Sequence, residues 1–245
     1  MAHRGGALLA ANVGRENTLR AFTNAVELGY RYLETDVHVT ADGVLIAFHD
    51  EDLDRVTDST GAIADLPWAQ VRQARVGGSE PIPRLDDLLE AFPDQRFNID
   101  IKAPGAVDPL VAAIQSHGAQ DRVCVGSFDG ARLRRFRRLA GSGVATSSTT
   151  RGVVWTRFVP FVPRLLSATG LALQIPVDHV LAGRRVRLVT SGLIATAQAA
   201  GRQVHVWTVD DPVQMHELID LGVDGLISDR IDVLRSVCVE RGLWR

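Results

Sequence analysis

The sequence has little of what marks secreted, membrane-spanning or nucleic-acid-binding proteins. Only two cysteines occur in 245 residues, Cys124 and Cys238, which argues against a disulfide framework. Cys124 lies in the apolar run RVCVGSF and is predicted to be a buried, reduced thiol. No apolar run is long enough to span a membrane. Because 27 Lys and Arg nearly balance 29 Asp and Glu, nothing indicates a nucleic-acid partner.

The first residues also lack the pattern of a secretory signal. MAHRGG reaches a charged, glycine-rich stretch at once, without an apolar segment. A cytoplasmic location is the default expectation. A native start upstream of Met1 would leave a leader invisible here.

Short apolar runs alternate with helical patterns along the chain. The expected helices are 18–28, 84–91, 108–116, 131–139, 191–200, 212–221 and 232–240. The expected strands are 2–4, 32–37, 97–102, 122–127, 144–148, 171–175, 204–208 and 225–228. Strands alternating with helices predict an α/β fold, a closed (β/α)8 barrel in one domain over 1–245. An open doubly wound sheet is the fallback, but no GxGxxG follows the first strand.

Two segments interrupt the alternation. Residues 51–83 are too long for a plain connection and predict a small insertion after the second strand. The apolar, aromatic stretch 153–166 contains Pro160 and Pro163, which disfavour a long helix. It follows the fifth strand and is expected at the mouth, where it either covers core or contacts a lipid.

Polar residues occupy one face of two of the predicted strands. Side chains alternate along a strand, so Glu34 and Asp36 share a face, as do Asn98, Asp100 and Lys102. If the apolar faces pack against helices, three carboxylates converge inside the barrel. Hard oxygen ligands of this kind suit Mg²⁺ or Ca²⁺. The alternative is that the carboxylates pair with interior cations, as Asp100 can with Lys102.

Two histidines stand where predicted strands end. His3 opens HRGG, and His49 follows VLIAF and precedes Asp50, which either orients the imidazole or caps the next turn. Such a pair can divide proton transfer between nucleophile and leaving oxygen. Arg4 and Lys102, with a cation, would clamp a phosphate, which indicates phosphodiester chemistry. The other histidines receive structural interpretations: His38 beyond the site, His205 in a barrel layer, and His117, His179 and His216 at the surface.

These motifs, taken in order, resemble the glycerophosphodiester phosphodiesterase family. The matching pieces are HRG (3–5), ENT (16–18), ETD (34–36), TADG (40–43), HD (49–50), IP (82–83), NIDIK (98–102), WTV (207–209) and GVDGLISD (222–229). No piece is specific alone, but the ordered set covers nearly the whole chain.

The resemblance implies a distorted barrel of the phospholipase-C-like phosphodiesterase type, with an insertion after the second strand. It implies metal-dependent cleavage of a glycerophosphodiester to glycerol 3-phosphate and an alcohol. By position, Glu34, Asp36 and Asp100 would be ligands of one divalent cation, and His3 and His49 the acid/base pair. Arg4 and Lys102 would contact phosphate, and Trp207 would wall the glycerol pocket.

The chain departs from the family pattern at two places. Asp100 stands where most members have Glu, which retracts a carboxylate by one methylene and predicts altered affinity or specificity. Only two residues precede His3, so we expect either that the first strand is weakly held or that the chain is longer in the cell.

Two other functions stay open from the sequence. A lysophospholipase D would use 153–166 to hold an acyl chain or touch a bilayer as a peripheral contact. A barrel that binds phosphate ligands without turnover would need no acid/base pair, yet every such position is filled.

Overall fold

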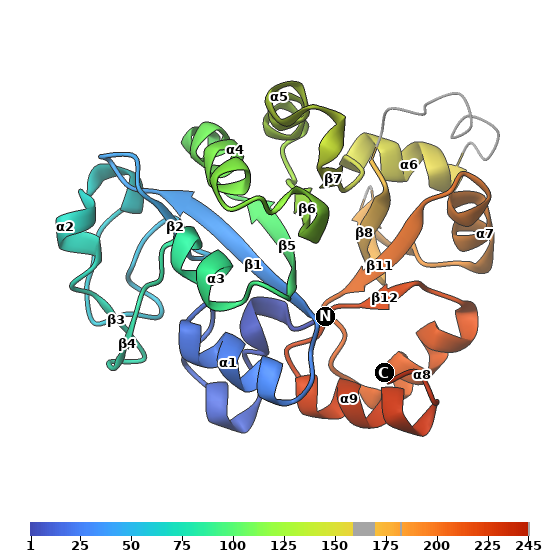
Figure 1. The fold of residues 1–245 in the computed structure, drawn as a ribbon. Coiled ribbons are helices and arrows are strands. Elements are labelled where there is room, and N and C mark those ends of the chain that lie inside the picture. The colour runs from blue at the N-terminus through green and yellow to red at the C-terminus, as the bar shows by residue number, and fades with distance from the viewer. Residues whose placement is uncertain (159–169, 182, 245) are drawn as a thin grey trace.

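Parallel strands pair in a closed ring in this computed structural model, which describes residues 1–158, 170–181 and 183–244 (Figure 1). Isolated bridges complete the ring, because Ser147 pairs with Ala172, and Ala2 pairs with both Ser228 and Leu33. This is the eight-stranded α/β barrel that the sequence predicts. In ring order the strands are Ala2, β1 (Tyr32–Val39), β5 (Arg96–Ile101), β6 (Val123–Gly126), β7 (Ala145–Thr146), β8 (Ala172–Pro176), β11 (Gln203–Trp207) and β12 (Gly225–Leu226).

Helices surround the ring (Figure 1), and those for which a range was predicted agree with it to within one or two residues, whereas the helix Thr150–Phe158 had no predicted range. Side-chain caps explain several of their boundaries: Thr18 accepts from the Ala21 amide at the start of α1, and Asp211 caps α8. The helices are α1 (Leu19–Glu27), α3 (Leu85–Ala91), α4 (Val107–Ser116), α5 (Gly130–Ala140), α6 (Thr150–Phe158), α7 (Ser191–Ala199), α8 (Pro212–Leu221) and α9 (Ile231–Glu240). Short 3₁₀ turns are η1 (His3–Gly5), η2 (Ala10–Asn12), η3 (Ile63–Asp65), η4 (Pro104–Ala106), η5 (Gln120–Arg122) and η6 (Gly141–Gly143).

The main core lies between the outer faces of the strands and the helices. Leu33, Phe97 and Ile99 are essentially buried on those faces. Phe22 of α1 packs edge-on against Phe97, with ring centroids 6.3 Å apart. The apolar faces therefore point outward as predicted, which leaves the polar faces of β1 and β5 inside the barrel.

The first strand differs from its prediction. Only Ala2 pairs, because Arg4 and Gly5 have positive φ (50° and 84°) and turn the chain into η1. Gly5 is needed there because an added Cβ would lie 2.8 Å from the Ala21 Cβ. The single residue Ala2 is nevertheless hydrogen-bonded to β1: its amide donates to the Tyr32 carbonyl (3.0 Å), and its carbonyl accepts from the Glu34 amide (2.9 Å). That the strand is weakly held stays a prediction.

The segment 51–83 projects from one side of the barrel (Figure 1). It follows β2 (Leu45–Ala47), which runs antiparallel to β1, and contains η3, α2 (Trp68–Val71), β3 (Arg75–Val76) and β4 (Glu80–Pro81). It has an apolar cluster of its own, built from Ile46, Phe48, Leu53, Ile63, Val71, Ala74, Val76 and Ile82. That cluster fixes the residues after His49 relative to the barrel.

Two elements border the carboxyl ends of the strands near β8. The stretch 153–166 begins as the last part of α6, while residues 159–166 lie outside the described part of the chain. A hairpin of β9 (Asp178–Leu181) and β10 (Arg184–Arg187) follows β8. Within the described ranges, every helix is too short or too polar to cross a bilayer.

Candidate active site

One cavity of about 370 Å³ opens at the carboxyl ends of the strands. All of the predicted site residues line it, although they are spread from the third residue to the 207th. They are His3, Arg4, Glu34, Asp36, His49, Asp100, Lys102 and Trp207. In a barrel of this kind the carboxyl end is where chemistry takes place.

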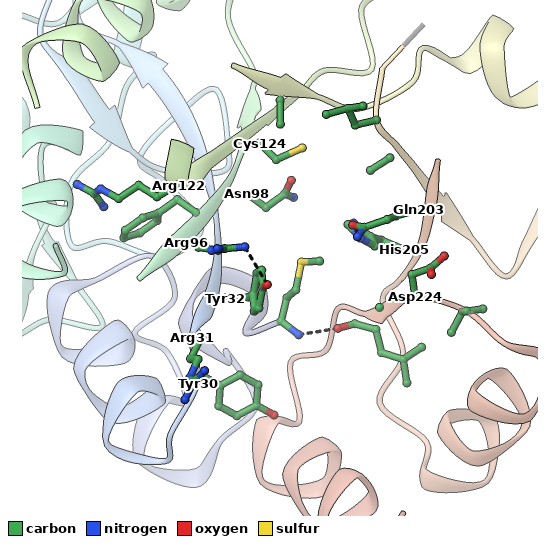
Figure 2. A pocket seen from close by; sticks show the side chains of 18 of the residues that line it. Tyr30, Arg31, Tyr32, Arg96, Asn98, Arg122, Cys124, Gln203, His205 and Asp224 are labelled. Carbon is green, nitrogen blue, oxygen red and sulfur yellow. Dashed lines mark hydrogen bonds between the residues drawn. The ribbon is translucent and has the colours of Figure 1, made fainter. Parts of the chain in front are cut away.

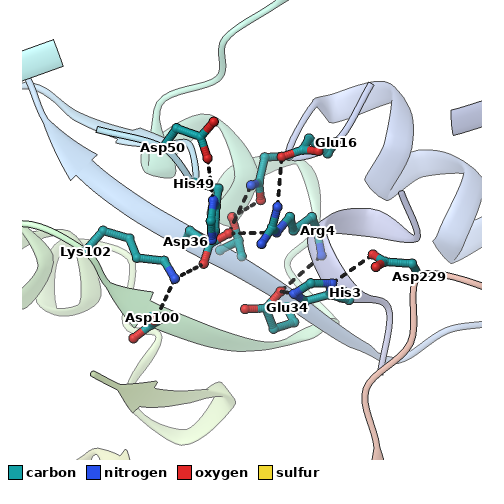
Figure 3. A network of polar contacts seen from close by, with 12 residues as sticks. His3, Arg4, Glu16, Glu34, Asp36, His49, Asp50, Asp100, Lys102 and Asp229 are labelled. Carbon is teal, nitrogen blue, oxygen red and sulfur yellow. Dashed lines mark hydrogen bonds and ion pairs between the residues drawn. The ribbon is translucent and has the colours of Figure 1, made fainter. Parts of the chain in front are cut away.

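Lysine and carboxylates pair at the floor of this cavity (Figure 3). Asp36 of β1 and Asp100 of β5 are register partners across the parallel pair. The Lys102 Nζ lies 3.0 Å from the Asp36 Oδ1 and 2.8 Å from the Asp100 Oδ2. Asp36 and Asp100 together raise the pKa of Lys102, although burial opposes this. Lys102 therefore carries a positive charge between two carboxylates.

Glu34 is less well compensated than Asp36. Burial, then the charge of Asp36, raises the Glu34 pKa to about 7. Burial would also raise the pKa of Asp36, but Lys102 and Arg4 bring it below its usual value. Within the described part of the chain, Glu34 accepts only a backbone hydrogen bond from Arg4 (3.0 Å) and lies 3.8 Å from the His3 Nε2. This local excess of negative charge is what a further cation would relieve.

A divalent ion fits this site by donor chemistry. Glu34, Asp36 and Asp100 are hard oxygen ligands facing one cavity. In residues 1–158, 170–181 and 183–244, no three acidic, His or Cys side chains are gathered closely enough to hold an ion as they stand. Lys102 occupies the space between two of the three, so the ammonium and a cation would compete for Asp36 and Asp100.

His3 is oriented by a residue from the far end of the chain. Its Nδ1 lies 2.8 Å from the Asp229 Oδ1. Although burial opposes it, Glu34 and Asp229 raise the pKa of His3. Asp210 holds this turn through the Ser228 hydroxyl (2.9 Å) and the Asp229 amide (2.8 Å). The motif GVDGLISD contains Asp229, but no role for it followed from the sequence.

His49 is oriented by its neighbour in sequence. The His49 Nδ1 lies 2.6 Å from the Asp50 Oδ1, so Asp50 orients the imidazole rather than capping a turn. Asp50 in turn binds Arg55 of the insertion, whose hydrogen bond is the main reason that the Asp50 pKa falls to about 2. Arg55 also binds Glu16, and Glu16 accepts from the Arg4 Nη1 at 3.0 Å. Sequence reasoning assigned no role to Glu16 or Arg55.

The opposite wall of the cavity is aromatic. Phe128 stands edge-on to Trp207, with ring centroids 5.5 Å apart, and its ring lies 5.6 Å from the Lys102 Nζ. Of the residues on this wall, Trp207 was predicted to line the cavity, whereas Phe128 and His179 were not. The prediction of a surface position for His179 is confirmed by its exposure, yet it missed the cavity.

The remaining histidines lie elsewhere. His38 is 4% exposed, and its Nε2 lies 3.1 Å from the His49 carbonyl, so it supports the loop rather than the cavity. His117 pairs with Asp86, and His216 lies 3.6 Å from Glu240. His205 sits inside the barrel towards its other end.

A larger cavity of about 760 Å³ lies at that other end, among the first residues of the strands (Figure 2). Its wall includes Tyr32, Asn98, Cys124 and His205. Cys124 is a free thiol, as predicted, but it is half-buried at the cavity wall rather than fully buried. Its partial burial raises its pKa to about 12. Among the described residues that line the larger cavity, no acid forms an ion pair with a base, unlike in the smaller one, so we place the chemistry in the smaller.

The chain is similar to known proteins over nearly its whole length. The family model of the glycerophosphoryl diester phosphodiesterase family matches residues 3–233. A Mycobacterium tuberculosis protein named probable glycerophosphodiester phosphodiesterase 2 is 42% identical over 248 residues, covering 100% of this chain and 92% of that protein. A glycerophosphodiester phosphodiesterase from Caldanaerobacter subterraneus is 30% identical (99% and 98% covered). A human lysophospholipase D is 25% identical (96% and 84% covered).

Solved structures share the fold. A Silicibacter pomeroyi protein, whose name refers to glycerophosphoryl diester phosphodiesterase activity, superposes with a TM-score of 0.82 at 24% identity. The match covers 100% of this chain and 94% of that one. An Oleispira antarctica phosphodiesterase in complex with the product sn-glycerol-3-phosphate gives 0.80 at 23% identity, covering 97% and 95%.

Proposed function

The chain belongs to the glycerophosphoryl diester phosphodiesterase family and is a phosphoric diester hydrolase, and we propose that it cleaves small glycerophosphodiesters with two histidines and one divalent cation. The products would be glycerol 3-phosphate and an alcohol. The observation that carries the proposal is the convergence of all the predicted residues on one cavity. The complex of the Oleispira antarctica relative with sn-glycerol-3-phosphate supports the product.

The two histidines flank the charged floor and would divide the proton transfers between them. One accepts the proton of the attacking hydroxyl as a new P–O bond forms. The other donates a proton to the alcohol oxygen as the old P–O bond breaks. If the attacking hydroxyl belongs to water, glycerol 3-phosphate is released directly; if it belongs to the glycerol 2-position, a cyclic phosphate forms first, and water then opens it to glycerol 3-phosphate. Asp229 and Asp50 accept from the Nδ1 atoms of His3 and His49, which leaves each Nε2 for this work.

The cationic groups would bind the phosphate. Among the described residues the buried Arg4 Nε has no hydrogen-bond partner, although it forms an ion pair with the Asp36 Oδ2 at 3.4 Å. An arginine with an unused donor at a cavity wall suits a phosphate oxygen. Lys102 supplies a second positive charge, and Trp207 with Phe128 supplies an apolar wall for the glycerol carbons.

Glu34, Asp36 and Asp100 would hold Mg²⁺ or Ca²⁺. When bound, the cation supplies charge neutralisation at the phosphate oxygens. The shorter Asp100 side chain, in place of the Glu that most members have, is consistent with its present pairing with Lys102.

The test uses protein stripped with EDTA. Release of glycerol 3-phosphate from glycerophosphocholine is measured with Mg²⁺ and Ca²⁺ added back separately, and cation binding is measured by calorimetry on the wild type and on Glu34→Gln. We expect turnover only with cation, and weaker binding by the variant. Full turnover after stripping would refute the cation requirement, and unchanged turnover by His49→Ala would reveal a contaminating activity or a barrel that only binds.

A lysophospholipase D activity is the second candidate. Apolar side chains stand exposed near the mouth: Phe128 (66%), Val154 (43%), Trp155 (47%) and Val180 (63%). They come from three separate elements, and two of them, Phe128 and Val154, line the cavity. Such a rim would accept an acyl chain or rest on a bilayer as a peripheral contact.

Trp155→Ser separates the two candidates. It should slow choline release from lysophosphatidylcholine and leave turnover of glycerophosphocholine unchanged. The matched control is Leu171→Ser, because Leu171 is 60% exposed but lines the cavity at the opposite end. Equal effects of Trp155→Ser on both substrates would count against a role in lipid binding.

A further inference from the structure

The two His–Asp pairs of the site are held in different ways. Asp229 is fixed within the barrel, where Asp210 ties the turn after β12 through the Asp229 amide and the Ser228 hydroxyl. Asp50 is instead bound by Arg55, a residue of the insertion. The insertion therefore reaches one of the two histidines through a single side chain.

Arg55 uses its whole guanidinium to join two carboxylates. Its Nε and Nη2 donate to Asp50 at 2.5 and 3.0 Å. Its Nη1 and Nη2 donate to Glu16 at 3.1 and 2.7 Å. A planar guanidinium that binds two carboxylates in this way sets the distance and the angle between them.

Each carboxylate passes this constraint to a group in the cavity. The same Asp50 Oδ1 that accepts from Arg55 also contacts the His49 Nδ1. The same Glu16 Oε1 also accepts from the Arg4 Nη1. Arg55 thus connects His49 to Arg4 through two shared oxygen atoms. Its hydrogen bonds also lower the pKa of both carboxyls, so both stay charged as acceptors.

Arg55 itself does not line the cavity, whereas His49 and Arg4 do. Its side chain is 48% exposed and forms the outer side of the network. Its backbone is anchored by Leu53, which is 1% exposed in the apolar cluster of the insertion, and by the pairing of Thr57 with Val76. The folded insertion therefore presents this side chain from a fixed place.

We propose that Arg55 is a positioning residue, which holds the imidazole of His49 and the guanidinium of Arg4 in one arrangement by binding Asp50 and Glu16 together. This rests on the proposed function, in which His49 moves a proton and Arg4 binds phosphate. In this proposal the insertion has a role in the site. Its apolar cluster supports the geometry around His49 through Arg55, while the barrel itself supports the geometry around His3 through Asp229.

The test compares Arg55→Met and Arg55→Lys with Arg75→Met. Arg75 belongs to the same insertion, but its Nη1 donates to the carbonyls of Arg72, Gln73 and Ala74. Arg75→Met therefore weakens the insertion without removing the link. Kinetics with glycerophosphocholine are read beside the melting temperature and the NMR signal of the His49 Nδ1 proton.

We expect Arg55→Met to lower kcat about 10- to 100-fold, because small misplacements of catalytic groups have effects of this size. The His49 Nδ1 proton signal should weaken, and Arg55→Lys should recover part of both losses. Arg75→Met should leave kcat within about twofold even where it lowers the melting temperature. In an Asp50→Asn background, Arg55→Met should add less than its effect in the wild type, because the link to His49 is already cut.

Wild-type kcat and an unchanged imidazole signal in Arg55→Met would overturn the proposal, as would equal losses in Arg55→Met and Arg75→Met. His49→Ala is measured alongside. An active His49→Ala would mean that the acid/base role has failed, and the imidazole signal would then decide the positioning role by itself. An inactive His49→Ala beside a fully active Arg55→Met would mean that only the positioning role has failed.

Discussion

The two ends of the barrel differ in size and in chemistry. The cavity among the first residues of the strands has about twice the volume of the cavity at their carboxyl ends (760 against 370 Å³). Yet the smaller one gathers the paired charges, from His3 with Asp229 to Lys102 with Asp36. Burying a charged side chain is costly, so a cluster of paired charges inside a barrel indicates a function, whereas the size of a cavity alone does not. Charge convergence is therefore the better guide to the site.

His205 illustrates the difference at the larger cavity. Its Nε2 lies 3.0 Å from the Gln203 Oε1, while its buried Nδ1 has no hydrogen-bond partner among the described residues. The site histidines both have a carboxylate on Nδ1. An imidazole with no carboxylate partner is suited to stay neutral and to serve structure.

The largest expected effect comes from removing either site histidine. His3→Ala and His49→Ala should each lower kcat for glycerophosphocholine about 10³-fold, in the usual range for acid/base catalysis. A glycerophosphodiester with a nitrophenol leaving group should restore turnover to one variant only, because a good leaving group needs no proton. The variant that recovers has lost the general acid. Wild-type rates in either variant would refute the assignment.

The pH dependence of the free energy of unfolding should be governed in part by His205, at the end of the barrel with the larger cavity. Burial lowers the pKa of His205 to about 4, below its value near 6.5 in an unfolded chain. Between these pH values the unfolded chain binds a proton that the folded protein excludes, so stability falls as pH decreases from 6.5 to 4. The loss is at most about 3 kcal/mol.

Urea unfolding at several pH values measures this loss. His205→Gln removes the titrating group and should flatten the decline between pH 6.5 and 4, and His216→Gln on α8 is the matched histidine control. A decline of the same slope in His205→Gln would show that other groups govern acid stability.

The orienting carboxylates should have a smaller effect than the histidines. Asp50→Asn and Asp229→Asn keep shape but lose the charge that each imidazole contacts, and each should lower kcat about 10- to 100-fold. The melting temperature should also fall for Asp50→Asn, because the Asp50 carboxylate that binds Arg55 and His49 has a lowered pKa and so stabilises the folded state; kcat is therefore measured well below the transition. Unchanged kcat in both variants would show that the imidazoles need no orienting partner.

The smallest effect is expected from the wall of the larger cavity. Cys124→Ser should leave kcat/KM within about twofold, because this side chain faces the end without paired charges. A loss comparable to that of Asp50→Asn would break the contrast between the two ends and assign a catalytic contribution to the larger cavity.

The order of elements and the face of each site residue could be read from the sequence. Alternation along β1 and β5 places Glu34, Asp36 and Asp100 inside the barrel, because a strand has two faces and the apolar one must be buried. The motifs HRG and HD placed the two histidines at strand ends. Both inferences rest on local features, namely the alternation of side chains along a strand and the motifs at strand ends. They can therefore be made without knowing which strands pair.

Partnerships across the fold were decided only by the tertiary structure. The sequence could not show that Asp229 serves His3, that Arg55 joins Asp50 to Glu16, or that the lone residue Ala2 closes the ring. Each depends on segments far apart in the chain meeting at hydrogen-bond distance. That meeting is set by how the barrel closes and how the insertion packs its own core. The sequence by itself thus determined that the charged side chains of β1 and β5 and the two motif histidines face the cavity, and the closed barrel and folded insertion determined which of them touch.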